Sequence, residues 1–172
     1  MRLLGDVNWS AWVPQQRATL LFVIRDGQIL LIHKKRGLGA GNINGPGGRL
    51  EPGETPRAAA IRETEEEIGV TPQGVEARGE LFFQFVDGLS LHVTVFRAED
   101  FTGTLRETDE AIPLWASLDA IPYERMWADD RHWLPMLLAG DTFRGHFLFD
   151  GAALRDHRLE TVVASPPAGS GV

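Results

Sequence analysis

Residues 46–70 constrain the fold of this chain most, because a glycine-rich loop there runs directly into a segment with clear helix signals. Thr55 suits the N-cap position of the helix, and Pro56 suits its first turn, where a missing amide costs nothing. Gly69 suits the left-handed position that ends a helix. These signals predict a helix that begins at Thr55 and ends at Ile68.

Three glutamates are predicted to share one face of this helix, at positions i, i+3 and i+4. At about 100° per residue, the apolar positions fall on the opposite side. The glutamates are Glu63, Glu66 and Glu67, and the apolar side carries Ala60, Ile61, Thr64 and Ile68. Like charges repel unless a cation lies between them, and oxygen ligands favour Mg²⁺ or Mn²⁺ over zinc. Taken alone, such a cluster is more typical of an acidic, solvated face.

The spacing around the helix is more specific than the glutamates. It runs Gly48, five residues, Glu54, seven residues, Arg62-Glu63, two residues, Glu66-Glu67, one residue, Gly69-Val70. This pattern resembles the Nudix box, Gly-x5-Glu-x7-Arg-Glu-U-x-Glu-Glu-x-Gly-U with U apolar, and every fixed position matches. Thr64 occupies one apolar position, and its hydroxyl is expected to bond back to a helix carbonyl.

The resemblance implies a metal-dependent hydrolase. The expected ligands of Mg²⁺, or alternatively Mn²⁺, are Gly47, Gly48, Glu63, Glu66, Glu67 and Glu110, the glycines through their carbonyls. Arg62 is expected to pair with Glu54 and to fix the loop against the helix. A metal-activated water would attack phosphorus and split a pyrophosphate link. Glu63 and Glu110, the latter in a loop outside the box, are the two candidates for the base that accepts the proton of this water.

Segments beyond the box extend the resemblance over residues 17–163. In order they are KKRGLGAGNINGPGG, FFQFVDG, TDEAIPLW, MWADDRHWLPMLL and FRGHFLFDG. Together they resemble the oxidised-purine nucleoside triphosphatases, the animal homologues of bacterial MutT. Such enzymes convert 8-oxo-dGTP or 2-hydroxy-dATP to the monophosphate and pyrophosphate, which cleanses the nucleotide pool. The residues implied for a purine pocket are Thr19, Lys34, Asn44, Phe83, Trp127, Asp129 and Asp130.

The polar and aromatic residues of this pocket also have purely structural interpretations. Asn44 would hydrogen-bond the purine edge, or merely precede Gly45 in a turn. Trp127 would stack on the base, or belong to the core. Asp129 and Asp130 would meet the base as one protonated and one charged carboxyl, or cap the next helix. Their joint order and spacing favour the pocket.

Three positions depart from this family pattern. Ile43 stands where the family has Trp, and Pro46 and Leu38 stand where it has other aromatic residues. The expected consequence is a pocket with fewer aromatic side chains and an open choice of base. The fold and the metal site are expected to be unaffected.

Size and composition set the broad class. The 172 residues suit one domain, here 17–163, with an N-terminal arm at 1–16 and a flexible tail at 164–172. The chain has no cysteine, which excludes disulfides and thiolate zinc sites.

A net charge of -7 argues against duplex nucleic acid as a partner, although a metal-bound nucleotide remains compatible. No apolar run is long enough to span a membrane. We therefore expect a cytoplasmic monomer or small homo-oligomer.

The whole pattern predicts an α+β fold with a mixed, mostly antiparallel sheet and few helices. The Nudix resemblance implies that the loop-helix and a second, C-terminal helix flank the sheet as an α/β/α sandwich. Strands are expected at 17–24, 28–33, 79–86, 90–98, 111–115, 142–149 and 154–163, with a short strand near 47–51. Helical turns are expected at 117–121 and 122–126, and a helix at about 130–139. Asp-Gly pairs indicate hairpin turns, and Pro113 restricts its strand to an edge or a bulge.

The box defines a reaction class but not the leaving group. One alternative is a Nudix hydrolase for another nucleotide: an ordinary dNTP, a nucleotide sugar, a dinucleotide polyphosphate or capped RNA. A second alternative is a module that binds a nucleotide or protein without cleaving it. Such modules usually lose box carboxylates, and this chain retains all of them.

Overall fold

The computed structural model describes residues 1–163, and the tail predicted at 164–172 lies outside this range. Its strands are β1 Gln16–Arg25, β2 Gln28–Lys34, β3 Ile43–Asn44, β4 Gly47–Arg49, β5 Val70–Gln73, β6 Glu76–Phe85, β7 Ser90–Ala98, β8 Asp100–Gly103, β9 Ala111–Ser117, β10 Phe143–Asp150 and β11 Ala153–Thr161. Its helices are α1 Pro56–Ile68 and α2 Asp130–Leu138, with 3₁₀ turns η1 Leu4–Asp6, η2 Trp9–Ala11 and η3 Tyr123–Arg125.

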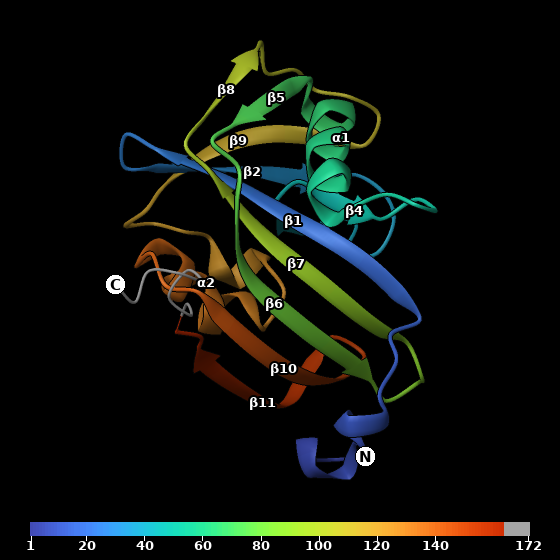
Figure 1. The fold of residues 1–172 in the computed structure, drawn as a ribbon. Coiled ribbons are helices and arrows are strands. Elements are labelled where there is room, and N and C mark those ends of the chain that lie inside the picture. Colours follow the sequence, from blue (N-terminus) through green and yellow to red (C-terminus); the bar gives the residue numbers. More distant parts are fainter. Residues whose placement is uncertain (164–172) are drawn as a thin grey trace, which may run out of the picture.

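A mixed nine-stranded sheet forms the centre of the molecule (Figure 1). Its main path is β11-β10-β6-β7-β1-β2-β3, with β4 added beside β1 and β9 beside β2. The β1–β7 and β6–β10 pairs are parallel, whereas the other pairs are antiparallel. A separate two-stranded sheet joins β5 to β8.

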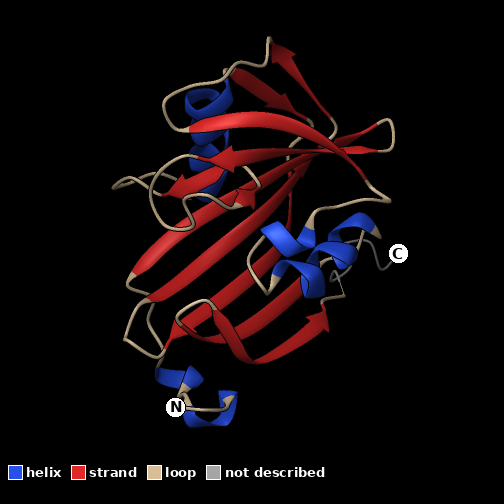
Figure 2. Ribbon diagram, turned by 180° about the vertical axis from the view of Figure 1, so that it is seen from behind, coloured by secondary structure: helices blue, strands red, loops and turns tan. Residues whose placement is uncertain are grey.

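Alternation along β1 creates one hydrophobic core on each face of the sheet. Leu21 and Val23 pack with Ala60 and Ile68 of α1. Phe22 and Ile24 point the other way, into a larger core that includes Trp133 of α2. The two helices therefore lie on opposite faces, as the views from the front and from behind show (Figures 1 and 2). The predicted α+β sandwich is confirmed.

The ends of α1 follow the predicted signals. The Thr55 hydroxyl accepts a hydrogen bond from the Ala58 amide at 3.2 Å, and Pro56 occupies the first turn. Gly69 adopts a left-handed φ of 77°, and its amide bonds the Glu65 carbonyl. Both caps satisfy backbone groups that a helix end would otherwise leave without a partner.

Most of the expected elements are confirmed, and one is shorter than expected. The strand around Pro113 is β9, which pairs only with β2 and so is an edge strand. At the position expected for a helical turn, 117–121, the chain forms one hydrogen-bonded turn, in which the Ala120 amide donates to the Ser117 carbonyl at 3.0 Å. The turn does not extend into a 3₁₀ helix, because Ser117 is still paired in β9 opposite Gln28. The sequence pattern also missed three short strands, β3, β5 and β8.

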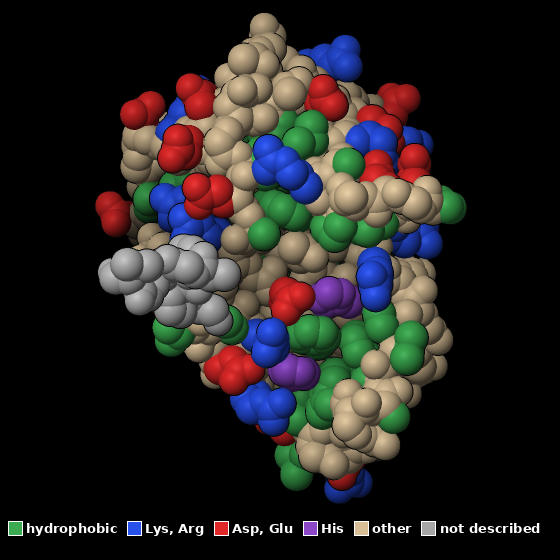
Figure 3. All heavy atoms as spheres, in the orientation of Figure 1, with side chains coloured by type: hydrophobic (Ala, Val, Ile, Leu, Met, Phe, Trp, Pro, Cys, Tyr) green, Lys and Arg blue, Asp and Glu red, His purple; other side chains and the backbone are tan. Residues whose placement is uncertain are grey.

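The N-terminal segment packs on the face of the sheet opposite α2, below α1 in Figure 1. The Trp12 indole donates to the side-chain oxygen of Gln84 at 2.8 Å and lies edge-on to Phe82. Trp9 lies edge-on to His146, at 4.7 Å between ring centres. Figure 3 shows histidine and apolar side chains gathered on this part of the surface. Within residues 1–163, no helix has the length and apolar character needed to cross a membrane.

Candidate active site

Arg62 connects the loop to the acidic face of α1. Its guanidinium donates to both carboxylate oxygens of Glu54, at 2.8 and 2.9 Å. Nη1 also donates to Glu63 at 2.9 Å and to Glu66 at 3.2 Å, and Nη2 donates to the Arg49 carbonyl at 3.2 Å. The side-chain hydrogen bonds from Arg62 lower the pKa of Glu54 to about 2. The expected Arg62–Glu54 pair is present, and its two-pronged geometry suits arginine specifically.

Two glycines bring the backbone of β4 against the carboxylates of α1. A Cβ on Gly48 would lie 2.5 Å from the Glu63 carboxyl carbon, so any other residue here would displace that carboxylate. A Cβ on Gly47 would overlap the carbonyl of Thr19, its neighbour across the sheet. The Gly47 amide donates to Glu67 at 2.9 Å. The loop glycines are thus required by close approach.

Glu67 corrects the helical-wheel expectation. The three glutamates were expected opposite the apolar positions, yet Glu67 is only 3% exposed. On the wheel it lies beside Ala60, and the docking of β4 on α1 then covers it. Thr64 is buried as well, and its hydroxyl donates to the Ala60 carbonyl at 2.8 Å, as predicted.

Within residues 1–163, acidic and histidine side chains form no ready-made group of three metal ligands. Each carboxylate has a protein partner instead: Arg62 bonds Glu63 and Glu66, and the Gly47 amide bonds Glu67. The donor chemistry nevertheless suits a divalent cation, because carboxylate oxygens dominate it. Burial raises the pKa of Glu67 to about 8, with the charges of Glu63 and Glu110 contributing. A cation beside Glu67 would favour the ionised form of its carboxyl.

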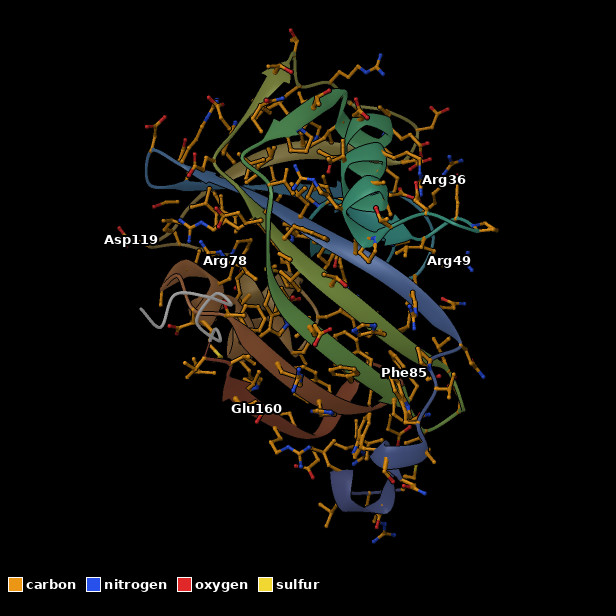
Figure 4. The ribbon with its side chains drawn as sticks, viewed as in Figure 1. Arg36, Arg49, Arg78, Phe85, Asp119 and Glu160 are labelled. Carbon is orange, nitrogen blue, oxygen red and sulfur yellow. The ribbon has the colours of Figure 1, made fainter. Side chains whose placement is uncertain are left out.

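Glu110 lies in the loop before β9, on the side of α1 where the α1 carboxylates gather. Its charge contributes to the raised pKa of Glu63, after burial as the main cause. Arg36 reaches its carboxylate at 3.4 Å, and the Lys35 amide donates to its carbonyl at 3.0 Å. Figure 4 places Arg36 at the same end of the molecule as α1. The loop therefore brings a fourth carboxylate toward the helix.

One pocket joins this acidic site to all seven residues predicted for purine binding. It lies between β1, β2, β6 and the start of α2. Its lining is Ala18, Thr19, Leu20, Ile32, Lys34, Leu38, Asn44, Gly45, Gly47, Gly48, Glu67, Phe83, Phe85, Leu91, Val93, Trp127, Asp129, Asp130 and Phe149. The Thr19 hydroxyl lies 3.5 Å from the Gly48 carbonyl, and Lys34 Nζ donates to the Leu38 carbonyl at 2.6 Å. A ligand in this pocket would touch both the loop glycines and Glu67.

Asn44 carries a buried hydrogen-bond donor in the pocket wall. Its side-chain Nδ2 is buried and has no hydrogen-bond partner among residues 1–163. A buried donor without a partner costs free energy unless a ligand or water accepts from it. Asn44 lies in the short strand β3, so the simple turn interpretation does not describe it.

Asp129 and Asp130 are buried side by side at the start of α2. Asp129 accepts a hydrogen bond from the Trp133 indole at 2.7 Å and makes no side-chain cap to the helix. Burial raises the pKa of Asp129 to about 6. Burial and the charge of Asp129 together raise the pKa of Asp130 well above its usual range. The pair can therefore present one protonated and one ionised carboxyl to a ligand.

Trp127 is half-buried and packs edge-on against Phe85 and Phe149, at 6.1 and 5.6 Å between ring centres. Sequence reasoning missed both phenylalanines as pocket residues. The signal for Phe85 was available, because it lies two positions after Phe83 on one strand and so shares its face.

The three departures from the family pattern have unequal consequences. Of these positions, only Leu38 lines the pocket. Ile43 belongs to the core on the α2 side, and Pro46 is buried without lining the pocket. Leu38 is therefore the one departure among the three that lies in the pocket wall, and its effect on the choice of base stays a prediction.

Residues 14–137 match the family model of the NUDIX domain. An oxidized purine nucleoside triphosphate hydrolase of Danio rerio is 42% identical over 146 residues, which cover 84% of this chain and 94% of the relative. The enzyme of the same name from Mus musculus is also 42% identical, over 76% of this chain and 85% of the relative. The crystal structure of the mutator MutT protein of Bacillus halodurans superposes with a TM-score of 0.74 at 27% identity, covering 84% and 97% of the two chains.

Proposed function

This chain belongs to the Nudix family of hydrolases, and from that premise we propose that it cleaves oxidised purine nucleoside triphosphates to the monophosphate and pyrophosphate. The two relatives at 42% identity carry the name of this activity. The observation that carries the proposal is that one pocket is lined both by the groups implied for purine recognition and by Glu67 with the loop glycines Gly47 and Gly48. A nucleotide whose base contacts Asn44 and Asp129 would place its phosphates near Glu67 and the loop glycines.

The pocket offers a specific set of contacts for a purine. The free Nδ2 of Asn44 would donate to an acceptor on the base, and Trp127 would stack on the ring. Asp129 and Asp130 would meet the polar edge with an acceptor and a protonated donor, which fits a base that carries an added oxo group. Leu38 at the pocket wall would provide apolar contact without stacking.

The acidic end supplies the hydrolytic machinery. Glu63, Glu66, Glu67 and Glu110, with the carbonyls of Gly47 and Gly48, would hold Mg²⁺. When bound, the ion lowers the pKa of water and offsets charge on the phosphates. Arg62 keeps Glu54 and the loop in register with α1, and Glu63 or Glu110 would accept the proton from the attacking water.

A substrate panel tests the proposal. Release of pyrophosphate would be measured with Mg²⁺ for 8-oxo-dGTP, 2-hydroxy-dATP, dGTP, GTP, ADP-ribose, a dinucleotide polyphosphate and capped RNA. We expect kcat/KM to be highest for an oxidised purine triphosphate. A kcat/KM for ADP-ribose far above that for 8-oxo-dGTP would contradict the proposed substrate. Absence of hydrolysis across the panel would favour a binding module.

A further inference from the structure

The loop that carries Glu110 donates hydrogen bonds to the last carbonyls of α1. The last carbonyls of a helix have no partner within it and need donors from elsewhere. Here the Arg106 amide donates to the Ile68 carbonyl at 3.1 Å. The Thr108 hydroxyl donates to the Glu67 carbonyl at 2.7 Å. The loop is thus bonded to the same turn that places the Glu67 side chain in the site.

Thr108 also fixes the conformation of its own loop. Its hydroxyl accepts a hydrogen bond from the Glu110 amide at 3.2 Å, while its amide donates to the Ala111 carbonyl at 3.0 Å. Lys35 Nζ donates to the Thr108 carbonyl at 2.8 Å, and the Lys35 amide donates to the Glu110 carbonyl. The half-buried hydroxyl is therefore a bridge between the backbones of Glu67 and Glu110.

We propose that Thr108 is a positioning residue, whose hydroxyl sets the placement of the Glu110 carboxylate relative to the carboxylates of α1. The inference rests on the proposed function, in which Glu110 and the α1 glutamates share one cation. Hydrogen bonds that orient a ligating residue commonly tune metal affinity, and here the bond is to the backbone amide of Glu110. Thr108 does not line the substrate pocket, so its effect should fall on metal binding and turnover rather than on nucleotide affinity.

The test compares Thr108→Val, which removes the hydroxyl at similar volume, with Thr108→Ser, which keeps it. Mn²⁺ binding followed by electron paramagnetic resonance should weaken by roughly 10–100-fold in the valine variant, with kcat reduced to a similar degree. KM for the nucleotide should stay near that of the parent. Serine should recover most of both losses. Thr102→Val, at an exposed position of β8, serves as the matched control and should change neither quantity.

Amide hydrogen exchange gives a readout that needs neither metal nor substrate. In Thr108→Val the Glu110 amide should exchange faster, while the Arg106 amide, which bonds the Ile68 carbonyl independently, should keep its protection. Combining Thr108→Val with Glu110→Gln should lower kcat no further than Glu110→Gln alone, because both changes act through one carboxylate.

Several outcomes would overturn the proposal. These are unchanged Mn²⁺ affinity in Thr108→Val, equal loss in Thr108→Ser, or fully additive effects with Glu110→Gln. The proposed function fails separately, if the parent enzyme hydrolyses no nucleotide of the panel. The Mn²⁺ titration and the exchange measurement would still decide the role of Thr108 in that case.

Discussion

At this site, the properties of single residues depend on how deeply each side chain is buried as well as on its chemical type. Glu67 shows the limit of sequence reasoning. Its wheel position beside Ala60 already places it near the apolar side of α1, but the covering of its carboxylate by the Gly47 amide of β4 depends on a segment distant from the helix face. The Arg62–Glu54 pair was predictable because the motif encodes it directly. The buried Nδ2 of Asn44 without a partner was not predictable, because it depends on where the folded chain places β3 in the pocket wall.

Asp130 should make the stability of the protein fall as pH rises. Its pKa is higher in the folded chain than in the unfolded chain, because burial and Asp129 disfavour its charge. Its favourable contribution is therefore complete below about pH 4 and is lost as pH rises through the folded pKa. In Asp130→Asn the side chain stays neutral at every pH. We expect the stability of this variant relative to the parent to increase between pH 5 and pH 8, measured by chemical denaturation.

Asp119→Asn is the control for this experiment. Asp119 is exposed and points away from the body of the molecule in Figure 4. Its replacement should leave the shape of the stability profile unchanged. A parallel profile for Asp130→Asn and the parent would show that the buried carboxyl does not titrate as described.

At the scale of elements, local signals predicted α1 and the long hairpin strands well. The short strands β5 and β8 were missed because they pair only with each other, and Pro72 lies inside one of them. The turn expected at 117–121 is shortened for a related reason, since the pairing of β9 with β2 extends to Ser117. Pairing between distant segments is information that a local pattern does not contain.

The glycine-rich loop after β2 contributes to the pocket through its backbone. Gly39 has a φ of +82°, and a Cβ there would lie 2.7 Å from Trp127 Nε1 and 3.6 Å from Asn44 Nδ2. Gly39→Ala should therefore displace the groups proposed to hold the base. We expect KM for the purine triphosphate to rise by roughly tenfold or more, because misplaced binding groups cost heavily. Steady-state kinetics with the preferred substrate of the panel would measure this.

Gly41→Ala separates backbone strain from the clash. Gly41 also has a positive φ, +90°, but a Cβ there would meet nothing within 4 Å. This variant should share the strain and raise KM much less. Equal effects of the two substitutions would mean that loop conformation, and not the contact with Trp127, controls binding.

The molecule as a whole places the purine pocket and the N-terminal segment on opposite faces of the sheet. The sheet carries α1 on one face and the purine pocket with α2 on the other, while the N-terminal segment packs on the face of α1. Adjacent residues of β6 illustrate the division. Phe83 lines the pocket, and Phe82 contacts Trp12 on the opposite face. The resemblance to known sequences anticipated the pocket residues, but it gave no information about this division.

Trp12→Ala should therefore destabilise the protein without changing catalysis. The variant loses the hydrogen bond to Gln84 and the packing on Phe82. We expect the melting temperature to fall by roughly 3–8 °C, and KM and kcat to stay unchanged below that temperature. Leu3→Ala, at a residue of the same segment that is 60% exposed, should have little effect on either. A change in KM for Trp12→Ala would indicate that the two faces are coupled.

The central claim is that the carboxylates of α1 perform the cleavage. Turnover of 8-oxo-dGTP by Glu63→Gln, with saturating Mg²⁺, tests it most directly. The substitution keeps the size of the side chain but removes its charge and its capacity to accept a proton. We predict a loss of kcat of roughly 10²–10⁴-fold, with an unchanged circular dichroism spectrum. Near-normal turnover by a correctly folded Glu63→Gln variant would contradict the account.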